Sequence, residues 1–364
     1  MDRIQISKPF MGEEEINAVK NVLLSGNLVQ GEKVREFENG IANYVGVKHG
    51  IATSSGTTAL QLAVDALGIK AGDEVITTPF TFISSSNCIL YNGAKPVFVD
   101  IDRKTFNIDP DLIEEAITER TKAILIVHLY GNVCDMKKIM RICKENNLML
   151  IEDCAQSIGA EFDGKRSGSF GEISALSFYA TKNLTTGEGG MLLSDKEDFA
   201  NSSRLKRSHG QQRIYEHEIV GYNYRMTDIV AAIGIEQLKK IEMFNKTRIE
   251  NAKLMTQLLS DVDGIILPYV QPEVKHVFHQ YTIRVLNGKR NGLMKHLNSN
   301  NVQSMVYYPT VVYLQQAYSD MGYESGICPE SERACKEVLS LPIHPYLKKS
   351  DLERIANEVK RYMK

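Results

Sequence analysis

Short apolar runs alternate with amphipathic stretches along the first two-thirds of the chain. The runs are almost continuously apolar, which is typical of strands that are covered on both faces. We expect such strands at residues 74–79, 96–100, 122–128, 148–153, 175–178 and 191–193. Helical spacing of apolar residues marks the stretches between them, residues 58–67, 110–117 and 136–145. This alternation predicts an α/β layered domain with a largely parallel sheet.

The pattern changes near residue 240. Thr227 and Asp228 mark the start of a helix, and apolar residues at helical spacing follow them. Beyond that helix the pattern predicts a second long helix over 246–259, strand-like segments at 279–285 and 302–308, and an amphipathic helix over 350–363. We therefore predict a large α/β domain over residues 1–240 and a smaller α+β domain over residues 241–364.

Composition narrows the possible function classes. The 364 residues include 43 Lys+Arg and 45 Asp+Glu, so the formal net charge is -2 at pH 7. Such a balance argues against a surface that coats nucleic acid. No apolar run approaches the ~20 residues needed to span a bilayer, and the N-terminal residues lack the pattern of a signal peptide. We expect a cytoplasmic protein without a nucleic-acid or membrane partner.

Motifs for metal binding and nucleotide hydrolysis are absent or incomplete in the sequence. The six cysteines form no C-x-x-C pair and read as buried free thiols. The stretch from Gly159 to Lys165 has the spacing of a P-loop, but Arg166 stands where Ser or Thr would hold magnesium. His276 and His279 lack the carboxylate of a zinc motif. We therefore expect neither a metal site nor a P-loop.

Two segments combine strand or helix ends with polar residues. The segment Ser54 to Leu60 places small hydroxyl residues around a glycine before a helix, which suits a phosphate, although a plain helix cap has the same composition. At residues 150–157 an apolar strand ends in carboxylates. Asp153 and Gln156 could face one ligand there, or could cap the next element.

Two further segments carry candidate chemistry. Lys182 lies between a strand-like run and the glycine-rich residues 185–190, where a lysine could form a Schiff base with a cofactor. A solvated lysine before a flexible turn would show the same pattern. The segment Gly221 to Asp228 gathers two tyrosines, Asn223 and an arginine. Such a cluster is typical of ligand contacts, a subunit interface, or an ordinary packed loop.

Taken together in chain order, six segments resemble the nucleotide-sugar aminotransferases of the DegT/StrS type. They read SSGTTAL, TPFTFISS, VHLYG, EDCAQSIGA, SFYATKNLTTGEGG and GYNYRMTD. The resemblance covers nearly the whole chain, from about residue 5 to beyond residue 345. It implies an α/β fold of the fold type I class that depends on pyridoxal 5′-phosphate (PLP). In that class a mostly parallel seven-stranded sheet is flanked by helices, and a smaller α+β domain follows.

The resemblance also implies a role for individual residues. Lys182 is implied to be the catalytic lysine, which holds PLP as a Schiff base and later moves the proton. Asp153 is implied to pair with the pyridine nitrogen, Gln156 to contact the phenolic oxygen, and Phe82 to stack on the ring. The remaining implied cofactor-binding residues are Gly56, Thr57 and Ser177 at the phosphate, and Asn223 at the phosphate of a neighbouring subunit. A homodimer with shared active sites follows from this last role.

The implied reaction moves an amino group from L-glutamate to a keto sugar nucleotide, with pyridoxamine 5′-phosphate formed on the way. The product is an amino sugar nucleotide for polysaccharide, glycan or natural-product biosynthesis. Related sugar dehydratases carry histidine at the lysine position, so Lys182 favours transfer and leaves dehydration as the alternative.

The nature of the sugar is less constrained. The run from Ile219 to Thr227 is similar to perosamine synthases, which aminate carbon 4 of a 4-keto-6-deoxy sugar. Tyr313 replaces a histidine that is frequent near the sugar in relatives. Amination at carbon 3, or of a cyclitol ketone, therefore stays open.

Overall fold

The computed structural model describes residues 2–364, and a seven-stranded sheet lies at its centre. The spatial order of the strands is β1-β9-β8-β5-β4-β2-β3. Their bounds are β1 His49–Thr53, β2 Glu74–Thr77, β3 Lys95–Phe98, β4 Thr121–Val127, β5 Met149–Asp153, β8 Ile173–Ser177 and β9 Gly190–Ser194. The strands from β3 to β8 pair in parallel, and β9 runs antiparallel to both β8 and β1. The predicted, mostly parallel sheet is confirmed.

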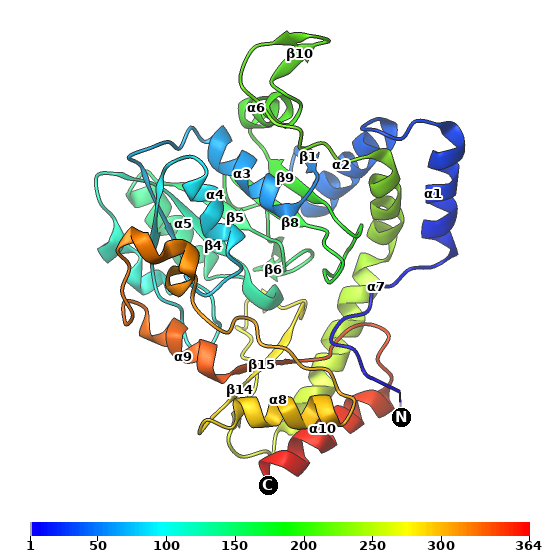
Figure 1. Cartoon of the computed structure of the whole chain (residues 1–364), viewed down its shortest axis with the longest axis vertical. Helices are drawn as coiled ribbons and strands as arrows, with labels where there is room; N and C mark the ends of the chain where they lie inside the picture. The colour runs from blue at the N-terminus through cyan, green and yellow to red at the C-terminus, as the bar shows by residue number, and fades with distance from the viewer. Residues whose placement is uncertain (1) are drawn as a thin grey trace.

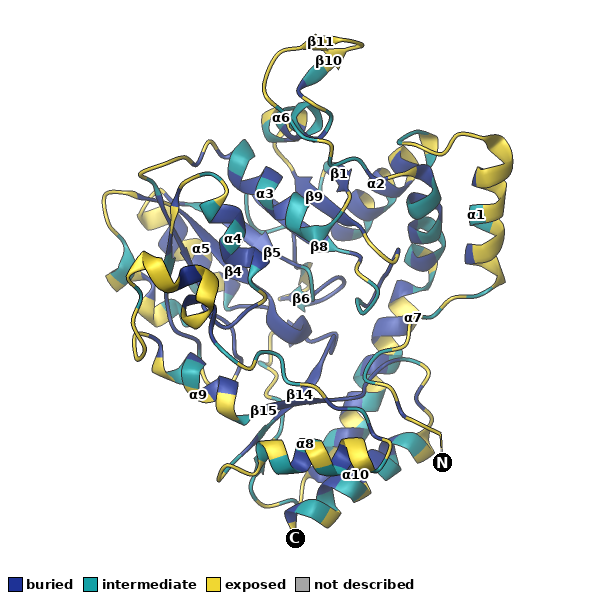
Figure 2. Cartoon of the chain, viewed as in Figure 1, coloured by how far each residue is buried: buried dark blue, intermediate teal, exposed yellow. Residues whose placement is uncertain are grey.

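Helices cover both faces of this sheet (Figure 1). They are α2 (Glu32–Val45), α3 (Gly56–Ala66), α4 (Ser84–Leu90), α5 (Met136–Glu145) and α6 (Glu197–Arg207). Helix α1 (Glu13–Ser25) packs instead against α7 (Asp228–Leu259). On β4, Leu125 belongs to the buried cluster that includes α3, whereas Ile124 and Ile126 belong to the cluster that includes α5. Successive side chains of a strand point to opposite faces. A strand with helices on both sides therefore reads as one apolar run, and Figure 2 shows these strands buried.

The long helix α7 (Asp228–Leu259) has 32 residues and passes through residue 240. The two helices predicted here are one helix, so the predicted break is wrong. The segment holds no proline, and its one glycine, Gly234, lies against Phe37, where a Cβ atom would be 2.5 Å from the ring. Nothing in the local sequence therefore interrupts the backbone hydrogen bonds. Its first turn is capped by the Thr227 side chain, which accepts from the Val230 N–H group at 3.4 Å.

The C-terminal part is built on a three-stranded sheet in the order β12-β14-β15. Its elements are β12 Ile265–Ile266, β14 Tyr281–Val285, α8 Arg290–Ser299, α9 Pro329–Glu337, β15 Val338–Leu341 and α10 Lys349–Met363. Leu293 and Leu297 of α8 pack with Leu352 and Ile355 of α10 in one buried cluster. The predicted strand near 281–285 and the predicted final helix are confirmed.

Two predicted elements are wrong. Residues 302–308 form no strand and make only isolated bridges, from Val302 to Ile4 and from Met305 to Ser340. Residues 110–117 form two 3₁₀ turns, Pro110–Leu112 and Glu114–Ala116, in place of a helix. In that stretch Ile113 is the residue classed as buried, so the turns offer little apolar surface to stabilise a longer helix.

Several contacts join residues from both sides of the predicted domain boundary. Ile4 pairs with Val302, and β13 (Val274–Lys275) pairs with β6 (Glu161–Phe162), which also pairs with β7 (Lys165–Arg166). The division into residues 1–240 and 241–364 stays a prediction. A hairpin, β10 (Gln211–Arg213) and β11 (Glu216–His217), projects beyond α6 (Figure 1). Among the described residues, no helix combines the length and apolar character required to cross a membrane.

Candidate active site

The candidate residues lie at the carboxyl ends of the parallel strands, where open α/β sheets place their ligands. Asp153 is the last residue of β5, and Phe82 lies in the loop after β2. Lys182 lies in the loop between β8 and β9, and Gly56 begins α3. The fold therefore gathers at one sheet edge residues that are far apart in the chain.

Asp153 is a buried carboxylate with defined hydrogen-bond donors. Its Oδ2 atom accepts from the Ser85 hydroxyl at 2.7 Å, and its Oδ1 atom accepts from the Ala155 N–H group at 3.0 Å. Burial raises the pKa of Asp153, while the Ser85 hydrogen bond and the positive charge of Lys182 oppose the rise. Burial destabilises the ionised form of Asp153, so a cation in contact with this carboxylate would stabilise that form.

Lys182 has an amine that can be neutral near physiological pH. Burial lowers its pKa to about 8, and the negative charge of Asp153 opposes this shift. The loop that carries it needs glycine at position 189, which has a φ angle of 156° and where a Cβ atom would lie 2.6 Å from the Thr186 hydroxyl. An amine with this pKa is both a nucleophile and a group that can take up and release a proton.

Gly56, Thr57 and Ser177 come together at the first turn of α3. A Cβ atom on Gly56 would lie 2.7 Å from the Ser177 Cβ atom, so only glycine allows this approach. The Thr57 hydroxyl is 2.8 Å from the Ser84 hydroxyl. Ser55 caps the helix by accepting from the Thr58 N–H group at 3.2 Å, so the cap interpretation is also correct. Hydroxyl groups beside the first N–H groups of a helix suit a phosphate.

Gln156 and Phe82 lie beside an unpredicted residue, Tyr308. The Gln156 Oε1 atom accepts from the Tyr130 N–H group at 2.8 Å, and its Nε2 atom donates to the Tyr308 hydroxyl at 3.2 Å. The rings of Phe82 and Tyr308 have centroids 6.4 Å apart, and Phe82 is 57% exposed. An aromatic ring this exposed has a face free to stack on a ligand.

Asn223 is exposed and pairs with Ser208 in an isolated bridge. The next residue, Tyr224, accepts from the Ser54 N–H group at 2.8 Å, so this segment runs beside the turn that precedes Gly56. Tyr313, which stands where relatives frequently have a histidine, is buried against Phe98 and donates its hydroxyl to Glu332 at 2.7 Å.

A buried polar network lies next to the lysine loop and was not predicted. The Asn183 Nδ2 group donates to Asn245 Oδ1 at 2.9 Å and to the Val277 carbonyl at 3.2 Å, and its Oδ1 atom is 3.2 Å from His279 Nδ1. The only sequence signal was the position of Asn183 directly after Lys182. These bonds tie the lysine loop to α7 and to the segment before β14, and so restrict where Lys182 can lie.

One group in the described part of the chain has metal-ligand chemistry: His128, Glu152 and Cys154. The Glu152 carboxylate is already used, because it lies 3.0 Å from His128 Nε2 and accepts from the N–H groups of Gly168, Phe170 and Gly171 at 2.7–2.8 Å. This network holds the loop after β5 in place, and we assign it a structural role.

The residues fit PLP. Glycine at position 56 lets the start of α3 lie close to Ser177, which any side chain at this position would prevent. The buried Asp153 carboxylate can hold a protonated ring nitrogen. Lys182 has an amine of lowered pKa. When bound, the cofactor supplies an electron sink that stabilises negative charge on an adjacent carbon. The chain supplies the proton transfer and the orientation.

Comparison with known proteins identifies the family. The chain matches the DegT/DnrJ/EryC1/StrS aminotransferase family over residues 9–360. It is 41% identical to the GDP-perosamine synthase of Caulobacter vibrioides, over 89% of this chain and 88% of that protein. It is 37% identical to a UDP-N-acetyl-3-dehydro-alpha-D-glucosamine 3-aminotransferase of Acidithiobacillus ferrooxidans, over 96% of this chain and 94% of that protein.

Solved structures agree with this assignment. S. venezuelae DesV, determined in complex with a ketimine intermediate, superposes with a TM-score of 0.95 at 34% identity, covering 100% of this chain and 99% of that one. The PLP form of Spr1654 from Streptococcus pneumoniae, a putative sugar aminotransferase by its description, has a TM-score of 0.95 at 28% identity, with 99% and 98% coverage. The chain belongs to the DegT/DnrJ/EryC1/StrS family and is a PLP-dependent sugar aminotransferase.

Proposed function

We propose that this enzyme transfers the amino group of L-glutamate to carbon 4 of a 4-keto-6-deoxy sugar nucleotide. The observation that carries the transfer is the lysine amine of lowered pKa, about 8, at Lys182, placed near enough to the buried Asp153 carboxylate for each charge to act on the other. The similarity to a GDP-perosamine synthase, at 41% identity, supports a sugar of this class.

The residues of the chain take the following parts in the proposed reaction. Asp153 holds the ring nitrogen of the cofactor, and Gly56, Thr57 and Ser177 hold its phosphate. The neutral Lys182 amine removes the proton from the α-carbon of glutamate in the first half. In the second half, its ammonium form delivers a proton to the sugar carbon that receives nitrogen. Gln156 and Phe82 orient the ring between these steps.

Two alternatives are weighed against this proposal. Amination at carbon 3 is supported by the name of the 37% identical Acidithiobacillus ferrooxidans relative, and a cyclitol ketone would need the same proton transfers. Dehydration of the sugar is less well supported. A dehydratase does not take an amino group from a donor, so it does not need a lysine amine for that transfer. Residue 182 of this chain is a lysine, and its pKa is lowered to about 8.

An isotope experiment tests the proposed function by following the amino nitrogen from glutamate to the sugar. The purified enzyme is incubated with ¹⁵N-glutamate and a panel of 3-keto and 4-keto sugar nucleotides, and the products are analysed by mass spectrometry and NMR. We expect ¹⁵N at carbon 4 of a 6-deoxy sugar and an equal amount of 2-oxoglutarate. Nitrogen at carbon 3 would correct the position, and loss of a hydroxyl group without ¹⁵N would replace the proposal with dehydration.

We also propose a homodimer in which Asn223 binds the cofactor phosphate of the neighbouring subunit. Asn223 is exposed, as are Tyr215 at the turn of the nearby hairpin and Val220 just after it, which are 89% and 91% exposed. Figure 2 shows this hairpin and α1 as exposed projections. Apolar side chains this exposed are typical of protein interfaces.

Mixing two inactive variants tests the shared site. Lys182→Ala lacks the amine but keeps Asn223, and Asn223→Asp places a negative charge at the phosphate but keeps Lys182. In a mixed dimer one site has both native residues, so activity should return to about a quarter of the wild-type level after subunit exchange, by the symmetry of a two-fold dimer. Activity no higher than the mean of the two parents would show that each site belongs to one subunit.

A further inference from the structure

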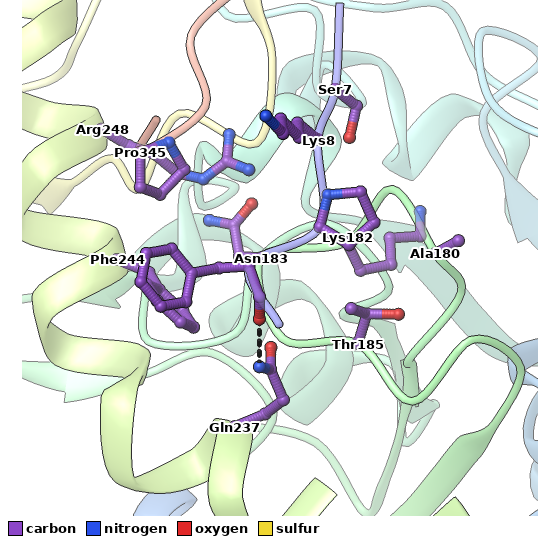
Figure 3. Close-up of a pocket in the computed structure, with 12 residues that line it drawn as sticks. Ser7, Lys8, Ala180, Lys182, Asn183, Thr185, Gln237, Phe244, Arg248 and Pro345 are labelled. Carbon is purple, nitrogen blue, oxygen red and sulfur yellow. Dashed lines mark hydrogen bonds between the residues drawn. The ribbon is translucent and has the colours of Figure 1, made fainter. Parts of the chain in front are cut away.

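A large cleft lies where the loop after β3, the strands β12 and β14, and helix α9 come together. Its volume is about 490 Å³, which is within the range of small-molecule sites. Its lining includes Arg103, Lys104, Tyr269, Arg284 and Arg333, and we call it the α9 cleft. The much smaller pocket drawn in Figure 3, which Lys182 lines, shares no lining residue with it. The α9 cleft is therefore separate from the pocket at the lysine loop.

The charged residues of the α9 cleft are mostly cations. Its one carboxylate, Glu337, is held by Arg284, whose Nη2 and Nε atoms lie 2.6 Å and 2.8 Å from the same Oε2 atom. Arg103 and Lys104 are exposed and form no ion pair within residues 2–364. Arg333 is also exposed and pairs only with a glutamate of its own helix, at 3.3 Å. Three cations are therefore available to an anion in the cleft, and arginine matches the geometry of phosphate.

The rest of the lining is largely apolar and includes an exposed aromatic ring. The apolar lining residues are Phe106, Ile266, Leu267, Tyr269 and Leu286. Tyr269 is 44% exposed, so its ring has a face free to stack on a ligand. The Lys104 ammonium lies 5.7 Å from the centre of that ring, which brings the cationic and aromatic parts of the cleft together. A ligand that uses both parts has a flat ring as well as negative charge.

A small buried cavity adjoins the cleft and contains an unpaired acceptor. The cavity shares Lys104, Phe106, Tyr269 and Thr282 with the cleft and has space for about one water-sized group. Asn132 lines it and is 2% exposed, and its Oδ1 atom has no hydrogen-bond partner in the described part of the chain. A buried acceptor without a donor is costly. A hydroxyl or amino group of a ligand would fit here, whereas a ring would not.

These features together restrict the class of ligand. A lone carboxylate or inorganic phosphate would leave most of the 490 Å³ empty and would not contact the apolar lining. A nucleoside diphosphate has phosphates for the three cations, a base for Tyr269, and hydroxyl groups that can donate to Asn132. We propose that the α9 cleft binds a nucleoside diphosphate, at a site distinct from the one that carries out amino transfer.

Photolabelling locates the site directly. The PLP-loaded enzyme is irradiated with an azido derivative of UDP or of GDP, and its tryptic peptides are analysed by mass spectrometry. We expect at least one of the two probes to label the peptide of residues 254–275, which contains Tyr269. Unlabelled UDP or GDP should compete at least about 10-fold better than pyrophosphate, because pyrophosphate has no ring to stack. No label on this peptide from either probe, or equal competition by pyrophosphate, would overturn the proposal.

A double variant tests the role of the cations. Arg103→Gln combined with Arg333→Gln changes two exposed side chains, so the fold should persist. The probe concentration needed to label residues 254–275 should rise by at least about 30-fold, because two charged contacts are lost. The turnover and the KM for the keto sugar nucleotide should stay within about twofold of the wild type, since neither arginine belongs to the candidate active site.

Arg361→Gln is the matched control. Arg361 is an exposed arginine of α10 that does not line the cleft, and its replacement should leave the labelling unchanged. Labelling of the double variant that equals labelling of this control would overturn the proposal. So would a KM for the sugar nucleotide that rises together with the loss of label, because the cleft would then be part of the substrate site.

Discussion

Replacing Lys182 with alanine is expected to lower turnover by about 10⁴-fold, because one amine provides both the attachment of the cofactor and the acid–base step. The Lys182 backbone N–H group donates to the Tyr179 carbonyl at 2.9 Å, and this bond does not depend on the side chain, so the fold should persist. Steady-state transfer from glutamate to the sugar nucleotide measures the loss. Thermal unfolding of Lys182→Ala checks that the variant is as stable as the wild type, so that the lost turnover can be assigned to the missing amine.

Two further readouts belong to the same substitution. Borohydride reduction followed by peptide mass spectrometry should attach PLP to the wild-type peptide that contains residue 182, and should attach none in Lys182→Ala. In the wild type, the rate of the donor half-reaction should rise with pH through about 8, because the neutral fraction of the Lys182 amine grows above its pKa. Lys196→Ala, at an exposed lysine, is the control. A Lys182→Ala variant within tenfold of that control would remove Lys182 from the catalytic role.

The parts of the fold that could be predicted are those set by local patterns. The apolar run of β4 indicated a strand covered on both faces, and Leu125 and Ile124 do pack on opposite sides of the sheet. The segment 302–308 has equally strand-like residues, but it pairs only through single bridges, from Val302 to Ile4 and from Met305 to Ser340 of β15. The spacing of apolar residues therefore predicts which residues are buried, but it does not predict which segments pair as strands.

The same distinction applies to the site. Lys182, Asp153 and Gly56 occur in segments whose composition is unusual, and the resemblance assigned them roles that the geometry accommodates. Ser85 and Tyr308 reach the site only through the fold: Ser85 donates to Asp153, and Tyr308 accepts from Gln156.

Replacing Asp153 with asparagine is expected to lower turnover by about 10²- to 10³-fold, the usual cost of removing one preorganised electrostatic contact. Asparagine has nearly the same shape and can still bond to Ser85, but it carries no negative charge. The ring nitrogen of PLP then loses the partner that keeps it protonated, and the electron sink weakens. Both half-reactions should slow together, since both depend on the same ring.

Ser85→Ala separates the charge of Asp153 from its position. That variant removes the 2.7 Å hydrogen bond to Oδ2 and leaves the carboxylate in place. Because the Ser85 hydrogen bond opposes the effect of burial, its loss should raise the pKa of Asp153 further. Activity of Ser85→Ala should therefore fall more at low pH than at high pH, whereas Asp153→Asn should be slow at every pH. Equal pH profiles for the two variants would mean that the charge of Asp153 does not act on the cofactor, and that its role is limited to holding the loop after β5.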